Sequence, residues 1–143
     1  MESIVGIWRI ISFDLVSESR GILQPFGEAL NGLVYYLQNG FMSGIISGSG
    51  RPDVSATATL GIPDSERVAI SRRFIAYAGK YTIEDNTVFH HVEVSFVPNL
   101  MRKEAHRNLF EVQGNRMTTR SIPKNTGNEE PVLELSWERI GTF

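Results

Sequence analysis

The dipeptide Asn39-Gly40 constrains the fold of this chain more than any other feature of its sequence. It lies between two apolar segments, residues 32–38 (Gly-Leu-Val-Tyr-Tyr-Leu-Gln) and residues 41–46 (Phe-Met-Ser-Gly-Ile-Ile). Asn-Gly favours the two-residue type I′ turn, in which both central residues take a positive φ, and this turn joins antiparallel strands. The segment therefore predicts a β-hairpin and, with it, an antiparallel sheet.

The rest of the chain repeats this pattern of short apolar runs separated by polar turns, which is typical of all-β domains. A length of 143 residues favours a single domain, residues 1–143. Eight antiparallel strands in one domain favour a closed barrel, because closure leaves no exposed strand edge. A two-sheet sandwich is the alternative architecture. Besides the hairpin, strands are expected at residues 5–15, 79–84, 87–96, 105–112, 116–121 and 132–140.

One helix is predicted in mid-chain, over residues 64–78, after a long loop at residues 47–63 that is rich in Gly, Ser, Thr and Ala. A loop of this length in a compact domain often acts as a lid. Asp64 or Ser65 is expected to cap the helix N-terminus, and Gly79 to end the helix in the left-handed conformation. One side of the helix is expected to be buried through an apolar stripe at helical spacing, formed by Ile70, Phe74 and Tyr77.

Composition excludes several classes of function. The chain has no cysteine, which removes thiol nucleophiles, disulfides and cysteine-ligated metals. Lys and Arg number 14 against 16 for Asp and Glu, and no basic stripe is present, so a nucleic-acid partner is not expected. No apolar run approaches the roughly 20 residues that span a bilayer. The first residues lack the features of a secretory signal, so we expect a cytoplasmic location without a membrane partner.

Several segments together carry a family resemblance. They are Gly6-Ile7-Trp8, residues 32–36 with residues 39–43, residues 77–81, the run His90-His91-Val92-Glu93-Val94-Ser95 with Pro98-Asn99, and residues 135–139. With these segments the chain resembles the small stand-alone lipocalin-like domain family, built on a calycin-type barrel. Trp8 is expected to close the base of such a barrel, with Arg139 stacked on its ring.

The resemblance implies a barrel with an internal cavity and, for a number of relatives, a place beside natural-product biosynthesis enzymes. Some small barrels of this general kind act as cofactor-free cyclases or isomerases, whereas classical lipocalins only carry ligands. The chain departs from the family at His106 and Asn108, where relatives more often have Gln and Arg. Its helix also lies between strands, unlike the C-terminal helix of classical lipocalins.

The direction in which each histidine points depends on strand parity. His90 and His91 are adjacent on one strand, so they face opposite sides of the sheet. The even positions of strand 87–96 are apolar apart from His90, which favours an inward His90 and an outward His91 and Glu93. By this interpretation His90 is a hydrogen-bonded core residue.

A second interpretation comes from the next strand, residues 105–112, which carries His106, Asn108 and the apolar Phe110 on one face. A simple hairpin register would place that face beside His91 and Glu93. The cavity wall would then carry an acid/base cluster. Both interpretations remain open at this point, and the second is preferred for function because buried polar groups would need an explanation.

The candidate chemistry is proton transfer. His91 and Glu93 are the candidate general base and its orienting carboxylate, and Tyr36 is the candidate donor to a developing oxyanion. Because His90 and His91 cannot share one site, a three-histidine metal site is not expected. Proton transfer by these side chains needs no other cofactor, so none is expected. The candidate ligand-binding residues are His90, His106, Asn108, Tyr81, Met42, Phe110 and Asn99.

Three functions follow from these observations. The first is a cofactor-free isomerase or cyclase that shapes a hydrophobic, oxygenated natural-product intermediate and moves a proton. The alternative is a non-catalytic carrier of a small hydrophobic ligand. The third is an interaction module whose barrel is filled by side chains. The chain is expected to be a monomer or a homodimer.

Overall fold

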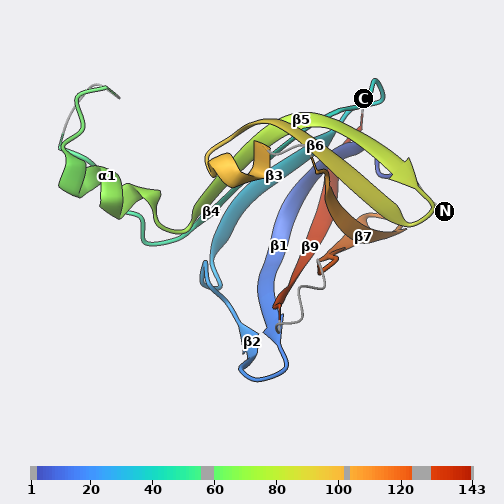
Figure 1. Ribbon diagram of the computed structural model, residues 1–143, viewed down its shortest axis with the longest axis horizontal. Helices are drawn as coiled ribbons and strands as arrows, with labels where there is room; N and C mark the ends of the chain where they lie inside the picture. Colours follow the sequence, from blue (N-terminus) through green and yellow to red (C-terminus); the bar gives the residue numbers. More distant parts are fainter. Residues whose placement is uncertain (1–2, 56–59, 102–103, 124–129, 143) are drawn as a thin grey trace.

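The computed structural model describes residues 3–55, 60–101, 104–123 and 130–142. They form an antiparallel sheet with the strand order β2-β1-β3-β4-β5-β6-β7-β8-β9, which closes because β1 also pairs with β9 (Figure 1). The closed barrel has eight strands, and the short β2 adds to the far end of β1. The predicted barrel is therefore confirmed, and the two-sheet sandwich is wrong. The elements are β1 (Gly6–Ser17), β2 (Gly21–Leu23), β3 (Leu30–Tyr36), β4 (Phe41–Gly48), α1 (Asp64–Ser71), β5 (Phe74–Glu84), β6 (Thr87–Ser95), the 3-10 helix η1 (Pro98–Met101), β7 (His106–Gln113), β8 (Arg116–Ser121) and β9 (Val132–Gly141).

The hairpin at Asn39-Gly40 is confirmed, but its turn differs from the predicted type. The amide of Leu37 donates to the carbonyl of Phe41 at 2.9 Å, and the amide of Gly40 donates to the carbonyl of Leu37 at 3.1 Å. Gly40 has a φ of 91°, whereas Asn39 does not have a positive φ. The connection is therefore a three-residue loop with one left-handed glycine, and not a type I′ turn.

The helix is shorter than predicted, because α1 ends at Ser71 and β5 begins at Phe74. The prediction of helix over residues 72–78 is wrong. Residues 74–78 belong to β5 instead, where they pair with β4 throughout and with β6 from Tyr77 onward. This pairing supplies backbone hydrogen bonds that a helix would otherwise supply. The expected caps are also wrong: Pro63 occupies the N-cap position without a side-chain hydrogen bond, and Gly79 lies within β5.

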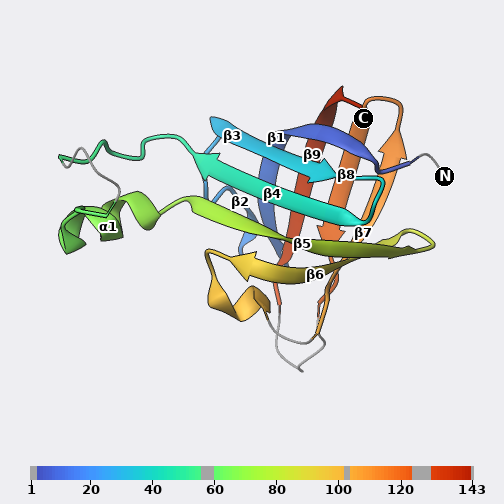
Figure 2. The same cartoon turned by 90° about the horizontal axis from the view of Figure 1, so that it is seen from above.

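The helix α1 projects away from the barrel rather than packing on it (Figure 2). None of its residues is buried, so the predicted buried stripe is wrong. The segments on either side of α1 are joined at their base by Arg51, whose guanidinium donates to the carbonyl of Ile70 at 2.7 and 3.0 Å and to Oγ of Ser47 at 3.3 Å. It also lies 4.7 Å from the ring centre of Phe74. Residues 56–59 of the predicted loop lie outside the described residues.

The inward side chains pack into one hydrophobic core. Trp8 is fully buried, donates from Nε1 to the carbonyl of Ile4 at 2.9 Å, and carries the guanidinium of Arg139 at 4.4 Å from its ring centre. The predicted stacking of Arg139 on Trp8 is therefore confirmed. Other buried members of the core are Ile10, Phe13, Val34, Tyr36, Met42, Ile46, Val88, Phe110, Val112, Met117, Leu135 and Trp137.

A β-bulge between β5 and β6 changes the side-chain parity of β6. Ala78 is opposite Val94 and Gly79 is opposite Val92, so Glu93 is an extra residue in β6. Gly79 is required here, because a Cβ atom would overlap the carbonyl oxygen of His91 and lie 2.8 Å from the amide nitrogen of Glu93. Beyond the bulge the even positions point outward, and Val94 is 61% exposed. The predicted even inner face therefore holds only as far as Val92.

Candidate functional site

His90 lies on the inner wall of the barrel. The register places it opposite Tyr81 of β5 and His106 of β7, and it is 5% exposed. Its neighbour His91 is exposed on the outer wall, where its Nε2 forms a hydrogen bond of 3.0 Å with Oγ1 of Thr82. The interpretation that placed His90 inside the barrel is therefore confirmed.

The second interpretation, which placed His91 and Glu93 on the cavity wall, is wrong. Residues 106–112 do present one face to the barrel interior, but the register sets His106 opposite His90, not opposite His91. The connection between β6 and β7 contains the helix η1, so the two strands do not follow a simple hairpin register. Glu93 is exposed as well. The catalytic roles assigned to His91 and Glu93 thus lose the geometric basis on which they rested.

The structure brings Tyr36 and His90 together instead. The hydroxyl of Tyr36 and Nε2 of His90 form a buried hydrogen bond of 2.7 Å. The ring of Tyr77 lies 5.8 Å from the ring of His90, and the ring of Tyr81 meets the ring of Tyr36 edge-on at 5.0 Å. The hydroxyl of Tyr81 donates to the carbonyl of Leu37 at 2.6 Å. We call Tyr36, Tyr77, Tyr81 and His90 the inner polar cluster.

The inner polar cluster is electrically neutral at neutral pH. Burial, together with the neighbouring His106 and His91, lowers the pKa of His90 to about 3. Burial raises the pKa of Tyr36 well above its usual value, as do the nearby Tyr77 and Tyr81. Burial also raises the pKa of Tyr77 to about 12. The cluster therefore offers neutral hydrogen-bond donors and acceptors rather than a charge.

A pocket of about 640 Å³ lies where β6 and β7 separate, and it reaches the inner polar cluster only through His106, the cross-strand neighbour of His90. The two strands pair only from Thr87 to His90, so the wall opens beyond His90. The inward-facing His106 and Asn108 line the pocket, together with Phe89. This volume falls within the range of small-molecule sites.

The remaining predicted ligand-binding residues are divided between the core and the surface. Met42 and Phe110 are buried in the hydrophobic core, 3% and 5% exposed. Asn99 is exposed on η1, in the connection between β6 and β7, and is not part of the inner polar cluster. Tyr77 is not among the predicted site residues, because the predicted helix stripe includes it. The alternation of Ile75, Tyr77, Gly79 and Tyr81 is the signal that indicates an inward position on a strand.

Within the described residues, no group of three or more His, Asp and Glu side chains is arranged to hold a metal ion. No helix in the described part of the chain has the length and apolar content needed to cross a membrane.

Comparison with known proteins identifies the family to which the sequence is similar. The family model of the lipocalin-like domain matches residues 5–140, nearly the whole chain. No curated protein matches the chain significantly. A barrel of this family is a small-molecule-binding architecture.

Proposed function

This chain belongs to the family of lipocalin-like domains, and from that premise we propose that its barrel binds a small hydrophobic ligand bearing oxygen atoms. The ligand, a natural-product intermediate, enters the pocket beside His106 and Asn108 and places an oxygen atom near the Tyr36–His90 pair. The buried hydrogen bond of 2.7 Å between Tyr36 and His90 is the observation that carries this proposal.

The chemical character of the site supports this ligand class. Ligand pockets are mostly apolar and hold a few convergent polar groups that fix the orientation of the ligand. Here Phe89, Ala105 and Ile122 form the apolar part of the pocket, and His106 and Asn108 are among its polar groups. The neutral inner polar cluster begins at His90, the cross-strand neighbour of His106. A neutral cluster favours a hydroxyl or carbonyl group over a carboxylate, because a buried charge without a counter-charge is costly.

Fluorescence titration with 2-naphthol and naphthalene tests the proposal, since the two probes differ only in one hydroxyl group. We expect 2-naphthol to bind more tightly than naphthalene. The substitution Tyr36→Phe should weaken 2-naphthol binding about tenfold, the effect of one lost hydrogen bond of about 1.4 kcal/mol. Naphthalene binding should stay unchanged in this variant.

The matched control is Tyr35→Phe, which removes the hydroxyl of the adjacent tyrosine on the outer wall, where the side chain is 38% exposed. This variant should bind 2-naphthol like the wild type. Equal weakening by Tyr35→Phe and Tyr36→Phe, or equal affinity of the wild type for both probes, would refute binding at the inner polar cluster.

Catalysis as a cofactor-free isomerase or cyclase is the second candidate, favoured by the same Tyr36–His90 contact. In this role the barrel folds the substrate into a reactive shape. Nε2–H of His90 donates to the Tyr36 oxygen, so that the single O–H of Tyr36 donates to a developing oxyanion. With a pKa of about 3, His90 is a weak base at neutral pH. His90 therefore orients Tyr36, and it can accept a proton only from an acidic group of the substrate.

Incubation with a panel of hydroxylated polyketide-type intermediates separates the two candidates. An isomerase or cyclase yields a product of unchanged mass and changed chromatographic retention, whereas a carrier returns its ligand unaltered. We expect Tyr36→Phe to lower turnover at least tenfold and the double variant His91→Ala, Glu93→Ala to leave it unchanged. Loss of turnover only in the double variant would reject the role of the inner polar cluster in catalysis.

A further inference from the structure

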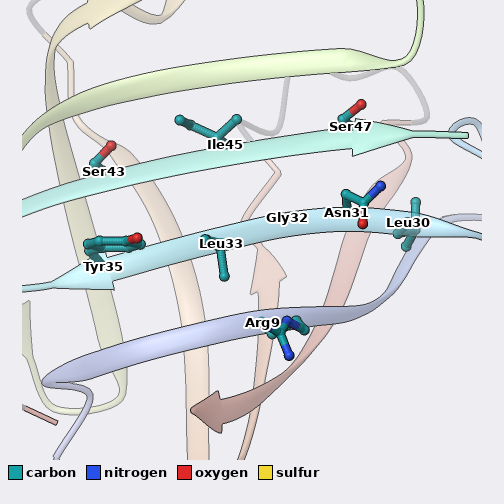
Figure 3. A pocket seen from close by; sticks show the side chains of 9 residues that line it. All are labelled: Arg9, Leu30, Asn31, Gly32, Leu33, Tyr35, Ser43, Ile45 and Ser47. Atoms are coloured by element: carbon teal, nitrogen blue, oxygen red, sulfur yellow. The ribbon is translucent and has the colours of Figure 1, made fainter. Parts of the chain in front are cut away.

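A second hollow lies on the outer wall of the barrel, away from the inner polar cluster. Residues of β1, β3 and β4 line a groove of about 560 Å³ there, which we call the outer groove (Figure 3). Its residues Leu33, Tyr35 and Ile45 alternate with inward-facing core residues along the same strands. The outer groove is therefore a separate site, on the opposite face of the sheet.

The floor of the outer groove is apolar, which is unusual for the solvent side of an antiparallel sheet. Tyr35 is 38% exposed and Ile45 is 49% exposed. The apolar surface continues onto β5 and β6, where a smaller hollow of about 180 Å³ adjoins Ile45 and ends at Val94 and Phe96. Exposed apolar surface of this extent commonly marks a binding site.

One cation lies at the β1 side of the outer groove. Arg9 stands opposite Leu33 of β3 and is exposed (Figure 3). Within the described residues its guanidinium makes no hydrogen bond or ion pair, whereas the guanidiniums of Arg51, Arg73 and Arg139 donate to backbone carbonyls. Glu138 of β9 is the cross-strand neighbour of Arg9, but the two form no salt bridge.

Hydroxyl groups complete the site along β4. Ser43 and Ser47 face the outer groove on either side of Ile45. The groove thus combines an apolar floor, hydroxyl groups at its border and a guanidinium that has no partner among the described residues. A guanidinium binds a carboxylate through two parallel hydrogen bonds, which fixes the carboxylate in position.

We propose that the outer groove binds an amphipathic monocarboxylate, with its carboxylate on Arg9 and its apolar chain along Leu33, Tyr35 and Ile45. The charge of the site selects the head group, and the apolar floor selects the chain. This ligand differs in class from the neutral oxygenated ligand proposed for the barrel interior.

Titration of the full chain with decanoate, below its micelle concentration, tests the proposal by calorimetry and by amide chemical shifts in ¹⁵N NMR spectra. We expect the largest shifts at Leu33, Tyr35 and Ile45. Decanamide, which has the same chain without the charge, should bind at least tenfold more weakly. Arg9→Gln should weaken decanoate binding at least tenfold.

Arg116→Gln is the matched control, because Arg116 is also an exposed cross-strand neighbour of Glu138 but does not line the outer groove. It should change the Kd for decanoate less than twofold. Tyr36→Phe should also leave decanoate binding unchanged, so failure of the interior site and failure of the outer groove are distinguishable.

Three results would overturn the proposal. The first is equal weakening by Arg9→Gln and Arg116→Gln, which would indicate a general effect of surface charge. The second is a set of chemical shifts centred on His90 rather than on the outer groove. The third is a stable dimer, seen by sedimentation velocity, that Ile45→Asp dissociates and decanoate does not, because a second copy of the chain would then cover the groove.

Discussion

Acidification from pH 7 to pH 5 should destabilise this protein by about 2 kcal/mol through His90 alone. Burial holds the pKa of His90 at about 3 in the folded chain, against about 6.5 in the unfolded chain. Between these two values the unfolded chain binds a proton that the folded chain does not bind. The contribution of His90 to the free energy of unfolding is therefore fully present above pH 6.5, and it decreases as the pH falls toward 3.

The loss of stability at pH 5 depends little on the pKa of His90 in the folded chain, as long as that pKa stays well below 5. Each pH unit below 6.5 favours the unfolded chain by about 1.4 kcal/mol. Because pH 5 lies about 1.5 units below 6.5, the loss is about 2 kcal/mol. The assay is urea unfolding at both pH values, which gives the free energy of unfolding from the midpoint and the slope.

The substitution His90→Gln isolates this effect, because carboxylates and the other histidines contribute in the variant as they do in the wild type. The variant should be less stable at pH 7, since it loses the hydrogen bond with Tyr36. Its further loss between pH 7 and pH 5 should be smaller than that of the wild type by about 2 kcal/mol. His91→Gln, at the exposed neighbouring position, is the control. An equal loss in His90→Gln and the wild type would refute the buried, neutral state of His90.

Two further predictions concern the bulge and the projecting helix. Gly79→Ala should lower the free energy of unfolding by about 3 kcal/mol or more. The reason is that the new Cβ atom meets backbone atoms of His91 and Glu93, which cannot rotate away. A urea midpoint unchanged from the wild type would contradict this prediction. Arg51→Ala removes the contacts with the carbonyl of Ile70 and the ring of Phe74, so the amides of α1 should exchange hydrogen at least tenfold faster while those of β1 stay protected. Equal protection of α1 in both proteins would show that Arg51 does not hold its base.

The barrel could be predicted from local signals because each hairpin turn and each alternating run depends on neighbouring residues. The hairpin at Asn39-Gly40 and the inward position of His90 both follow from such short-range patterns. The stacking of Arg139 on Trp8 was also accessible, although it joins the two ends of the chain. It follows from the resemblance to a barrel, in which the first and last strands pair.

The errors arise where long-range pairing decides between two local patterns. Residues 72–78 fit helical spacing through Phe74 and Tyr77, yet from Phe74 onward they alternate as a strand. Pairing with β4 and β6 favours the strand, and no short-range sequence pattern indicates this pairing. The register between β6 and β7 likewise depends on η1. The pattern of polar and apolar residues does not reveal how η1 affects the alignment of the two strands.

The pairing of β1 with β9 also sets the order in which this protein can fold. The second half of β1, from Ser12 to Val16, pairs with β9 along one edge, and among the described residues its other edge pairs only with the short β2. During synthesis this edge stays unpaired until residues 132–141 have been made. Such contacts between the two ends of a chain slow folding and leave an open strand edge exposed to other molecules. We therefore expect barrel closure to be the last folding step and the one most exposed to aggregation.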